Sequence, residues 1–242
     1  MSSFQTHITT STLLGIAYGG AGYATGEFPL PACLLAGGLC SLAGMLPDLD
    51  SDSGVPIRET MAFAAAVTPM LMMDRLQQLG LSHESMVVAG GCIYLLVRFG
   101  VAGLMKRYTV HRGMWHSLPA AAIAGLLAFL ICASPDMRLR LFKSLAVVLG
   151  FMSHLVLDEL ASFTIRRGRP RLKKSFGSAL KLYSRNGWAN ISTYGKLLIL
   201  IGLALGDPVL MEHLEQRQPR AHRLAREVQE SLQTLPGAPS RR

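Results

Sequence analysis

The chain has 242 residues; 50% of them are hydrophobic, only 16% are charged, and the formal net charge is +9. Soluble domains carry about a quarter charged residues, so the composition excludes a mostly disordered chain and a small disulfide-rich secreted fold, and it indicates a membrane protein. The four cysteines form no CxxC pair and lie in apolar runs, which is typical of small apolar side chains in lipid-facing or packed helices. No basic residue precedes the first apolar run, so we expect no signal peptide.

Apolar segments recur along the whole chain and predict an all-α, polytopic membrane bundle of about six transmembrane helices. Their bounds are about 12–25, 30–46, 61–73, 86–105, 117–134, 141–161 and 193–206. Crossing a bilayer untilted takes about 20 residues, so the runs 86–105, 117–134 and 141–161 are expected to span. The short first and third runs suit tilted or re-entrant helices, and the last, which contains Lys196, is expected not to span cleanly.

The basic residues of the connecting loops predict the orientation in the membrane. If the first six segments cross, one side receives the N-terminus and the loops at 47–60, 106–116 and 162–190. These loops hold twelve Lys and Arg residues, against four on the other side. The positive-inside rule then makes the first side cytoplasmic. We therefore expect a multi-pass protein of the inner (cytoplasmic) membrane.

His154 and Asp158 are the first pair of residues with metal-ligand spacing. They lie four residues apart in the predicted helix 141–161, so the imidazole and the carboxylate share one helix face and can meet one ion. Ionisable residues at membrane depth are costly and point to function. The alternative interpretation is a polar pair that only joins two helices.

Asp48 and Asp50 follow the second apolar segment, where two carboxylates can chelate an ion from a loop. One alternative is a solvated helix end. Another is calcium, because these residues with Asp52 and Glu59 match four ligand positions of an EF-hand loop. Ser53 stands where that loop requires glycine, and the preceding helix is apolar all round, so the sequence disfavours calcium.

His111 and His116 lie in a polar run before the fifth predicted helix. A spacing of five residues separates them on a continuous helix, so a loop that leads into a helix suits a shared site better. Ser117 is a suitable N-cap. The backbone N–H groups there, together with Arg112, can hold a phosphate. The alternative is a basic interfacial loop with Trp115 anchored among the lipid headgroups.

These motifs and His7 place imidazoles and carboxylates on one side of the predicted membrane. The expected metal ligands are His7, Asp48, Asp50, His111, His116, His154 and Asp158. Mixed nitrogen and oxygen ligands favour Zn²⁺ or Mn²⁺ over calcium. The set suits one ion with supporting residues, or two ions. As catalytic residues we expect Asp48 or Asp158 as a base and Arg112 on a substrate anion.

The same motifs resemble a known family. The matching runs are Thr6-His7, Gly44 to Ser51, His111 to Gly113 with His116-Ser117, and Ser153 to Leu155 with Asp158. In order and spacing, over roughly residues 1 to 165, they resemble the YdjM-like membrane-bound proteins of bacteria and archaea. The resemblance implies a polytopic helical fold and a divalent-metal hydrolase activity. Ser51, Asp52 and Trp115 depart from the residues that many members carry.

The C-terminal third is basic. We divide the chain into a membrane-embedded hydrolase-like domain (1–165), a basic amphipathic segment with a short apolar helix (166–210) and a polar tail (211–242). Within Arg166–Arg185, Phe176, Leu180 and Tyr183 have helical spacing and predict an amphipathic helix on an anionic lipid leaflet. A nucleic-acid contact and a solvated loop are the alternatives. The tail carries a further helical stripe: Leu224, Val228, Leu232 and Leu235.

From sequence, then, we expect a membrane-bound metal-dependent hydrolase at the cytoplasmic face. A metal-activated water would attack a phosphoester or a related bond, and a lipid-linked substrate fits a site at this depth. Two alternatives stay open. One is a non-catalytic metal-binding membrane protein, either a sensor or a carrier. The other is a membrane interaction scaffold, in which the His and Asp residues are structural; a nucleic-acid partner is not expected.

Overall fold

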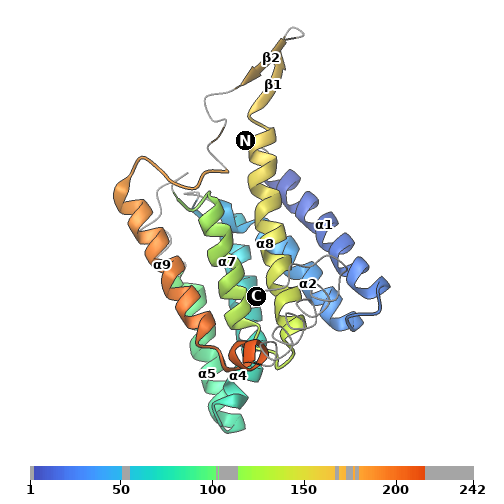
Figure 1. Ribbon diagram of the computed structural model, residues 1–242, viewed down its shortest axis with the longest axis vertical. Coiled ribbons are helices and arrows are strands. Elements are labelled where there is room, and N and C mark those ends of the chain that lie inside the picture. The colour runs from blue at the N-terminus through green and yellow to red at the C-terminus, as the bar shows by residue number, and fades with distance from the viewer. Residues whose placement is uncertain are drawn as a thin grey trace, which may run out of the picture.

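The described part of the chain is all-α apart from one β-hairpin (Figure 1). The computed structural model describes residues 3–50, 55–101, 103, 114–166, 169–172, 177 and 180–215. Its helices are α1 (Phe4–Ala24), α2 (Leu30–Ala43), α3 (Val55–Leu71), α4 (Met73–Gln78), α5 (His83–Leu95), α7 (Leu118–Ile131), α8 (Met137–Leu160) and α9 (Gly187–Leu205). A 3₁₀ turn, η1 (Leu46–Asp50), follows α2, and a π-helical segment, η2 (Leu96–Val101), extends α5. Strands β1 (Phe163–Arg166) and β2 (Arg169–Leu172) form the antiparallel hairpin.

Four helices of the described residues are long and apolar enough to cross a membrane, against the six expected. They comprise Leu30–Asp48, His83–Val101, Met137–Leu160 and Gly187–Leu205. The prediction of a full span at 117–134 is corrected, because α7 has only 14 residues and rises about 21 Å where a bilayer core needs about 30 Å. The last segment, expected not to span cleanly, forms a 19-residue helix, because Asn186 caps a helix that begins at Gly187, six residues before the apolar run.

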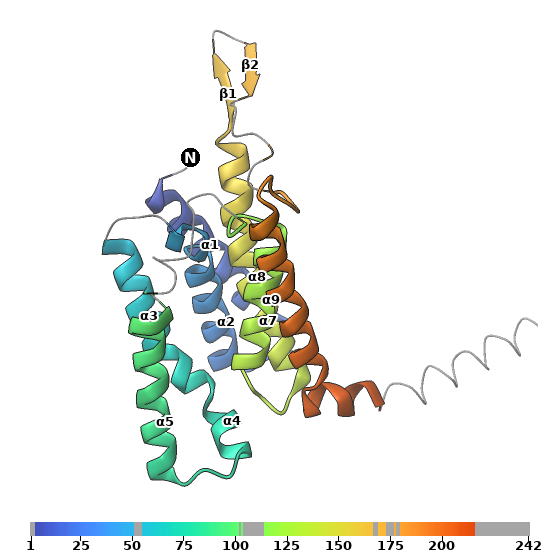
Figure 2. The same cartoon turned by 90° about the vertical axis from the view of Figure 1, so that its left-hand side faces the viewer.

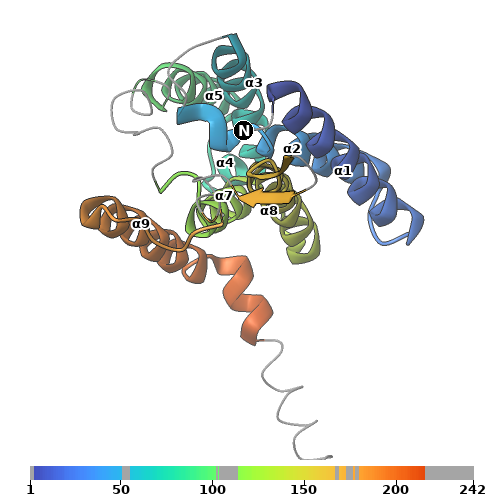
Figure 3. The same cartoon turned by 90° about the horizontal axis from the view of Figure 1, so that it is seen from above.

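A four-helix core of α1, α2, α7 and α8 supports the fold, with α8 in contact with the other three. Glycines allow α1 and α8 to lie close to α2. A methyl group at Gly15 on α1 would overlap the carbonyl oxygen of Gly37, and one at Gly150 on α8 would overlap that of Cys40. By contrast, a methyl group at Gly38 would meet only open space. Along the molecule's long axis, α7 and α8 lie between α9 on one side and α1 on the other (Figure 3).

The outer helices carry most of the exposed apolar surface. Helices α3 and α5 pack on each other beside the core (Figure 2), and no described residue of α5 is buried. Large apolar side chains on α5, η2 and α9 are exposed, among them Val88, Phe99 and Leu198. Contiguous apolar surface of this extent needs a partner. With four candidate spans present, that partner is the lipid bilayer.

A buried ion-pair cluster closes the end of the bundle at which α8 begins. Asp207, just after α9, accepts from both terminal nitrogens of Arg140 on α8 (2.6 and 2.9 Å) and from Arg75 on α4 (2.6 Å). The side chains of Arg140 and Asp207 are each only 1% exposed. The hydrogen bonds and charges of Arg140 and Arg75 hold the pKa of Asp207 well below its usual range. The cluster therefore fixes the end of α9 beside the start of α8.

The amphipathic helix predicted within Arg166–Arg185 is wrong. Residues 163–166 and 169–172 are strands, with Ile165 opposite Pro170, and residues 180–186 are not helical. Pro170 lacks the N–H that a helix interior requires but is tolerated in a two-stranded hairpin, where each strand is an edge. Phe176 and the tail stripe at 224–235 lie outside the described residues.

Candidate metal site

His154 is the centre of the candidate site. Helix α8 places its side chain fully buried, and its Nδ1 donates a hydrogen bond to the carbonyl oxygen of Gly44 at the end of α2 (2.7 Å). Since a carbonyl only accepts, this bond fixes the proton on Nδ1 and leaves the Nε2 lone pair for another partner. Nε2 is buried and has no hydrogen-bond partner in the described part of the chain.

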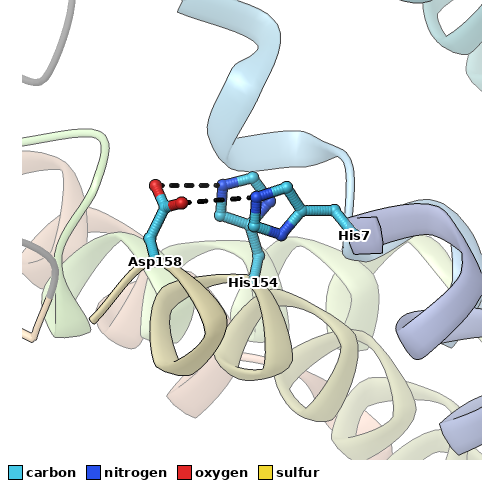
Figure 4. Close-up of side chains that lie close together, drawn as sticks. All are labelled: His7, His154 and Asp158. Atoms are coloured by element: carbon cyan, nitrogen blue, oxygen red, sulfur yellow. Dashed lines mark ion pairs between the residues drawn. The ribbon is translucent and has the colours of Figure 1, made fainter. Parts of the chain in front are cut away.

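Asp158 and His7 lie close to that nitrogen (Figure 4). Asp158 is one helical turn beyond His154, with its Oδ2 3.9 Å from His154 Nε2 and its Oδ1 3.3 Å from His7 Nε2. The rings of His7 and His154 stack, with centroids 3.7 Å apart. His7 reaches this position from the first turn of α1, where the side chain of Ser3 caps the helix.

Asp48 and His116 are the other two potential ligands near His154. Asp48 belongs to η1, and its Oδ1 is 3.5 Å from His154 Nε2 and 3.6 Å from His116 Nε2. His116 directly precedes α7, whose N-cap is Ser117 as predicted, and its ring meets His154 edge-on. Two sets of potential ligands result, His7–His154–Asp158 and Asp48–His116–His154, and both use His154.

The separations between these atoms suit ligands of one metal ion better than direct hydrogen bonds. A nitrogen–oxygen hydrogen bond normally spans 2.7–3.2 Å, whereas the four His–Asp separations run from 3.3 to 3.9 Å. Two ligands that each bind a zinc-like ion at about 2.1 Å in tetrahedral geometry lie about 3.4 Å apart. Three imidazoles and two carboxylates are also a donor set that borderline divalent ions favour. The residues present therefore fit a divalent metal.

Five of the seven expected ligands converge here, from α1, η1, the start of α7 and the end of α8. His111 and Arg112 lie outside the described residues, as does the side chain of Asp50. The EF-hand alternative fits poorly, because the Asp48 carboxylate faces two imidazoles and a calcium loop uses oxygen ligands. Metal binding and the catalytic roles of Asp48, Asp158 and Arg112 stay predictions.

Two supporting groups were not predicted from the sequence. The backbone carbonyl of Gly44 orients His154, and backbone acceptors leave no residue-type signal. Trp115 was considered only as an anchor among the lipid headgroups; its indole N–H donates to the carbonyl of Leu46 (2.7 Å), and its ring packs edge-on against Phe151. Trp115 thereby joins the turn that carries Asp48 to the turn that carries His116.

A family model described as YdjM inner membrane protein matches residues 1–217. The chain belongs to this family. The match extends beyond the 1–165 range of the motifs and takes in the hairpin and α9. No curated protein and no solved structure matched the chain.

Membership identifies an inner membrane protein, in agreement with the candidate spans, and it confirms the family predicted from the motifs. The chain is therefore an inner membrane protein with a buried His and Asp cluster that could hold a metal ion.

Proposed function

We propose that the protein is a membrane-bound, metal-dependent hydrolase and that the His/Asp cluster holds its ion. The proposed ligands are His7, Asp48, His116, His154 and Asp158. The observation that carries the proposal is the buried Nε2 of His154, which faces two carboxylates at 3.5 and 3.9 Å without a hydrogen bond to either. Such an arrangement is expensive in an apolar core unless a cation binds between the groups.

The geometry favours one ion in this cluster. Both ligand sets need His154, and only its Nε2 is available because Nδ1 donates to Gly44. One imidazole nitrogen carries one lone pair and binds one ion. Zn²⁺ or Mn²⁺ suits the donor set, Mn²⁺ being the better match if all five side chains ligate together.

A divalent ion in such a site makes a bound water molecule acidic near neutral pH and polarises a phosphoryl oxygen. Of the two carboxylates, Asp48 is the better candidate base, since its side chain is 26% exposed and that of Asp158 only 9%. The remaining oxygen of Asp48 would accept a proton from the attacking water, while the rings of His7 and His154 stay stacked behind it. Arg112 is proposed to bind the substrate anion.

Location favours a lipid-linked phosphoester as the substrate. Asp48 is the last residue of the candidate span Leu30–Asp48, and Asp158 lies two residues before the end of Met137–Leu160. Two spans thus end at the depth of the cluster, which is the depth of lipid headgroups. The basic loops at this end favour the cytoplasmic face.

The test is a phosphatase assay on lipid phosphates with purified protein in nanodiscs, run after chelation and after return of Zn²⁺ or Mn²⁺. We expect turnover that requires the ion and falls by two or more orders of magnitude in Asp48→Asn. His83→Ala is the matched control, because His83 is exposed at the start of α5. Metal-loaded protein without turnover, but with ion flux into proteoliposomes, would support a carrier and contradict the hydrolase.

A further inference from the structure

Lys196 lies at the middle of a candidate membrane span. It is the tenth of the 19 residues of α9, which begins after the polar cap Asn186 and ends two residues before Asp207. At a rise of about 1.5 Å per residue, each end of the helix is about 14 Å away along the axis, whereas a lysine side chain extends only about 6 Å. The ammonium group therefore does not reach the lipid headgroups at either end.

The side chain of Lys196 is exposed on the outside of the bundle. Helix α9 packs on α7, its buried residues Thr193 and Ala204 mark the packed face, and it lies at the edge of the bundle (Figure 3). Lys196 itself is exposed, and no hydrogen bond or ion pair joins it to the described part of the chain. A charge that meets lipid at this depth is costly. Its position therefore indicates an anionic partner that the described residues do not supply.

The surroundings of Lys196 on α9 suit contact with a second helix. Residues three or four apart share a helix face, and such steps along α9 give the α9 stripe: Trp188, Ser192, Lys196, Ile199 and Leu203. The three large apolar members of the stripe are all exposed. Gly195 and Gly202 border the stripe, and a methyl group at either would meet only open space. Small residues on a transmembrane helix let another helix approach closely.

The partner must carry a carboxylate at mid-depth, because lipid phosphates lie at the membrane surfaces. A second copy of the chain does not offer one: in the described helices every Asp and Glu lies within four residues of a helix end, Glu59 on α3 being the furthest in. Pairing α9 with itself would also oppose two lysines. We propose that the α9 stripe docks against a transmembrane helix of a different membrane protein, whose central Asp or Glu pairs with Lys196. This inference does not depend on metal binding or hydrolysis.

The first experiment uses a defined probe, a leucine–alanine transmembrane peptide with one central Glu, or with Gln as its control. Full-length protein, labelled at the exposed Cys92, is reconstituted with labelled peptide in lipid vesicles, and association is followed by energy transfer. The Glu peptide should bind about 10-fold more tightly than the Gln peptide, and Lys196→Leu should remove this preference. In the matched control Lys196→Leu/Leu198→Lys, a lysine two residues away leaves the stripe and should not restore it. Equal binding of both peptides to wild type, or full preference in that control, would overturn the proposal.

The second experiment identifies the partner in native membranes. A photo-reactive amino acid replaces Ile199 on the stripe or, as the control, its neighbour Leu198, since the two are 65% and 69% exposed. We expect a discrete adduct with another protein from position 199 only, lost in Lys196→Leu, which keeps its fold because leucine suits a lipid-facing site. Lys196→Glu combined with a lysine in place of the partner's carboxylate should restore the adduct. Cross-links to lipid alone, an adduct of two copies, or an adduct that persists in Lys196→Leu would contradict the proposal.

Discussion

A single methyl group at Gly150 should disturb the site from one helical turn away. Gly150 and His154 lie four residues apart on α8, and they face Cys40 and Gly44, which lie four residues apart at the end of α2. In Gly150→Ala the new methyl group would overlap the Cys40 carbonyl, and ordinary van der Waals contact begins at 3.4 Å. Helices α2 and α8 must then separate locally by roughly 1 Å.

That separation exceeds what the hydrogen bond between His154 and Gly44 tolerates. The bond is 2.7 Å long, so a displacement of roughly 1 Å carries it past the usual limit of about 3.2 Å. Overpacking costs about 1–3 kcal/mol, and the loss of a buried hydrogen bond a similar amount. Against a helix-propensity gain of about 1 kcal/mol for alanine over glycine, the free energy of unfolding should fall by about 1–5 kcal/mol.

The assay is thermal unfolding in detergent together with metal content, and Gly38→Ala is the matched control. Gly38 is also a mid-helix glycine on α2, but a methyl group there meets open space, so this variant should be unchanged or more stable by up to about 1 kcal/mol. Equal stability and equal metal content for Gly150→Ala and wild type would refute the idea that close packing of α2 on α8 positions His154.

Three further predictions concern the supporting residues. Asp207→Asn should destabilise the protein by about 3–5 kcal/mol because it leaves Arg140 buried without its charge partner. The control Glu27→Gln, which breaks the exposed pair with Arg138, should cost at most about 1 kcal/mol. Similar melting curves for the two variants would contradict the prediction. Because the pKa of Asp207 is lowered in the folded protein, its contribution to stability is present above about pH 4 and is lost as the pH falls further. Between about pH 4 and lower pH, the free energy of unfolding should therefore change less for Asp207→Asn than for Glu27→Gln. Parallel pH dependences of the two variants would argue against the lowered pKa. Trp115→Phe keeps the ring but removes the N–H that donates to Leu46, so metal affinity by competition titration should fall about 10-fold or more, and an unchanged affinity would limit Trp115 to packing.

Local spacing made much of the site predictable. His154 and Asp158 share a helix face by their separation alone, and Asp48 and His116 lie at helix ends that hydropathy places on one side of the membrane. His7 joins them because α1 begins at that same side. The common side follows from alternation of apolar segments, so residues far apart in sequence could be grouped before any contact was known.

The features that the sequence did not predict are contacts between residues far apart in the chain, and backbone conformation. The approach of Arg140 to Asp207 joins residues 67 positions apart, and no local pattern encodes it. The spacing of Phe176, Leu180 and Tyr183 predicts a helix within Arg166–Arg185, whereas Pro170 disfavours a helix interior and lies in the hairpin that forms there. Helix α7 is shorter than its apolar run because it ends at Ile131, and residues 132–136 form the non-helical connection to α8.

Metal content is the most direct test of the central claim. Inductively coupled plasma mass spectrometry would be applied to detergent-purified wild type, His154→Ala and the control His83→Ala, each checked for folding. The site predicts about one equivalent of Zn²⁺ or Mn²⁺ per chain in wild type and in His83→Ala, lost in His154→Ala. Wild type without bound metal, even after reconstitution with both ions, would contradict the claim and leave the cluster as polar packing between helices.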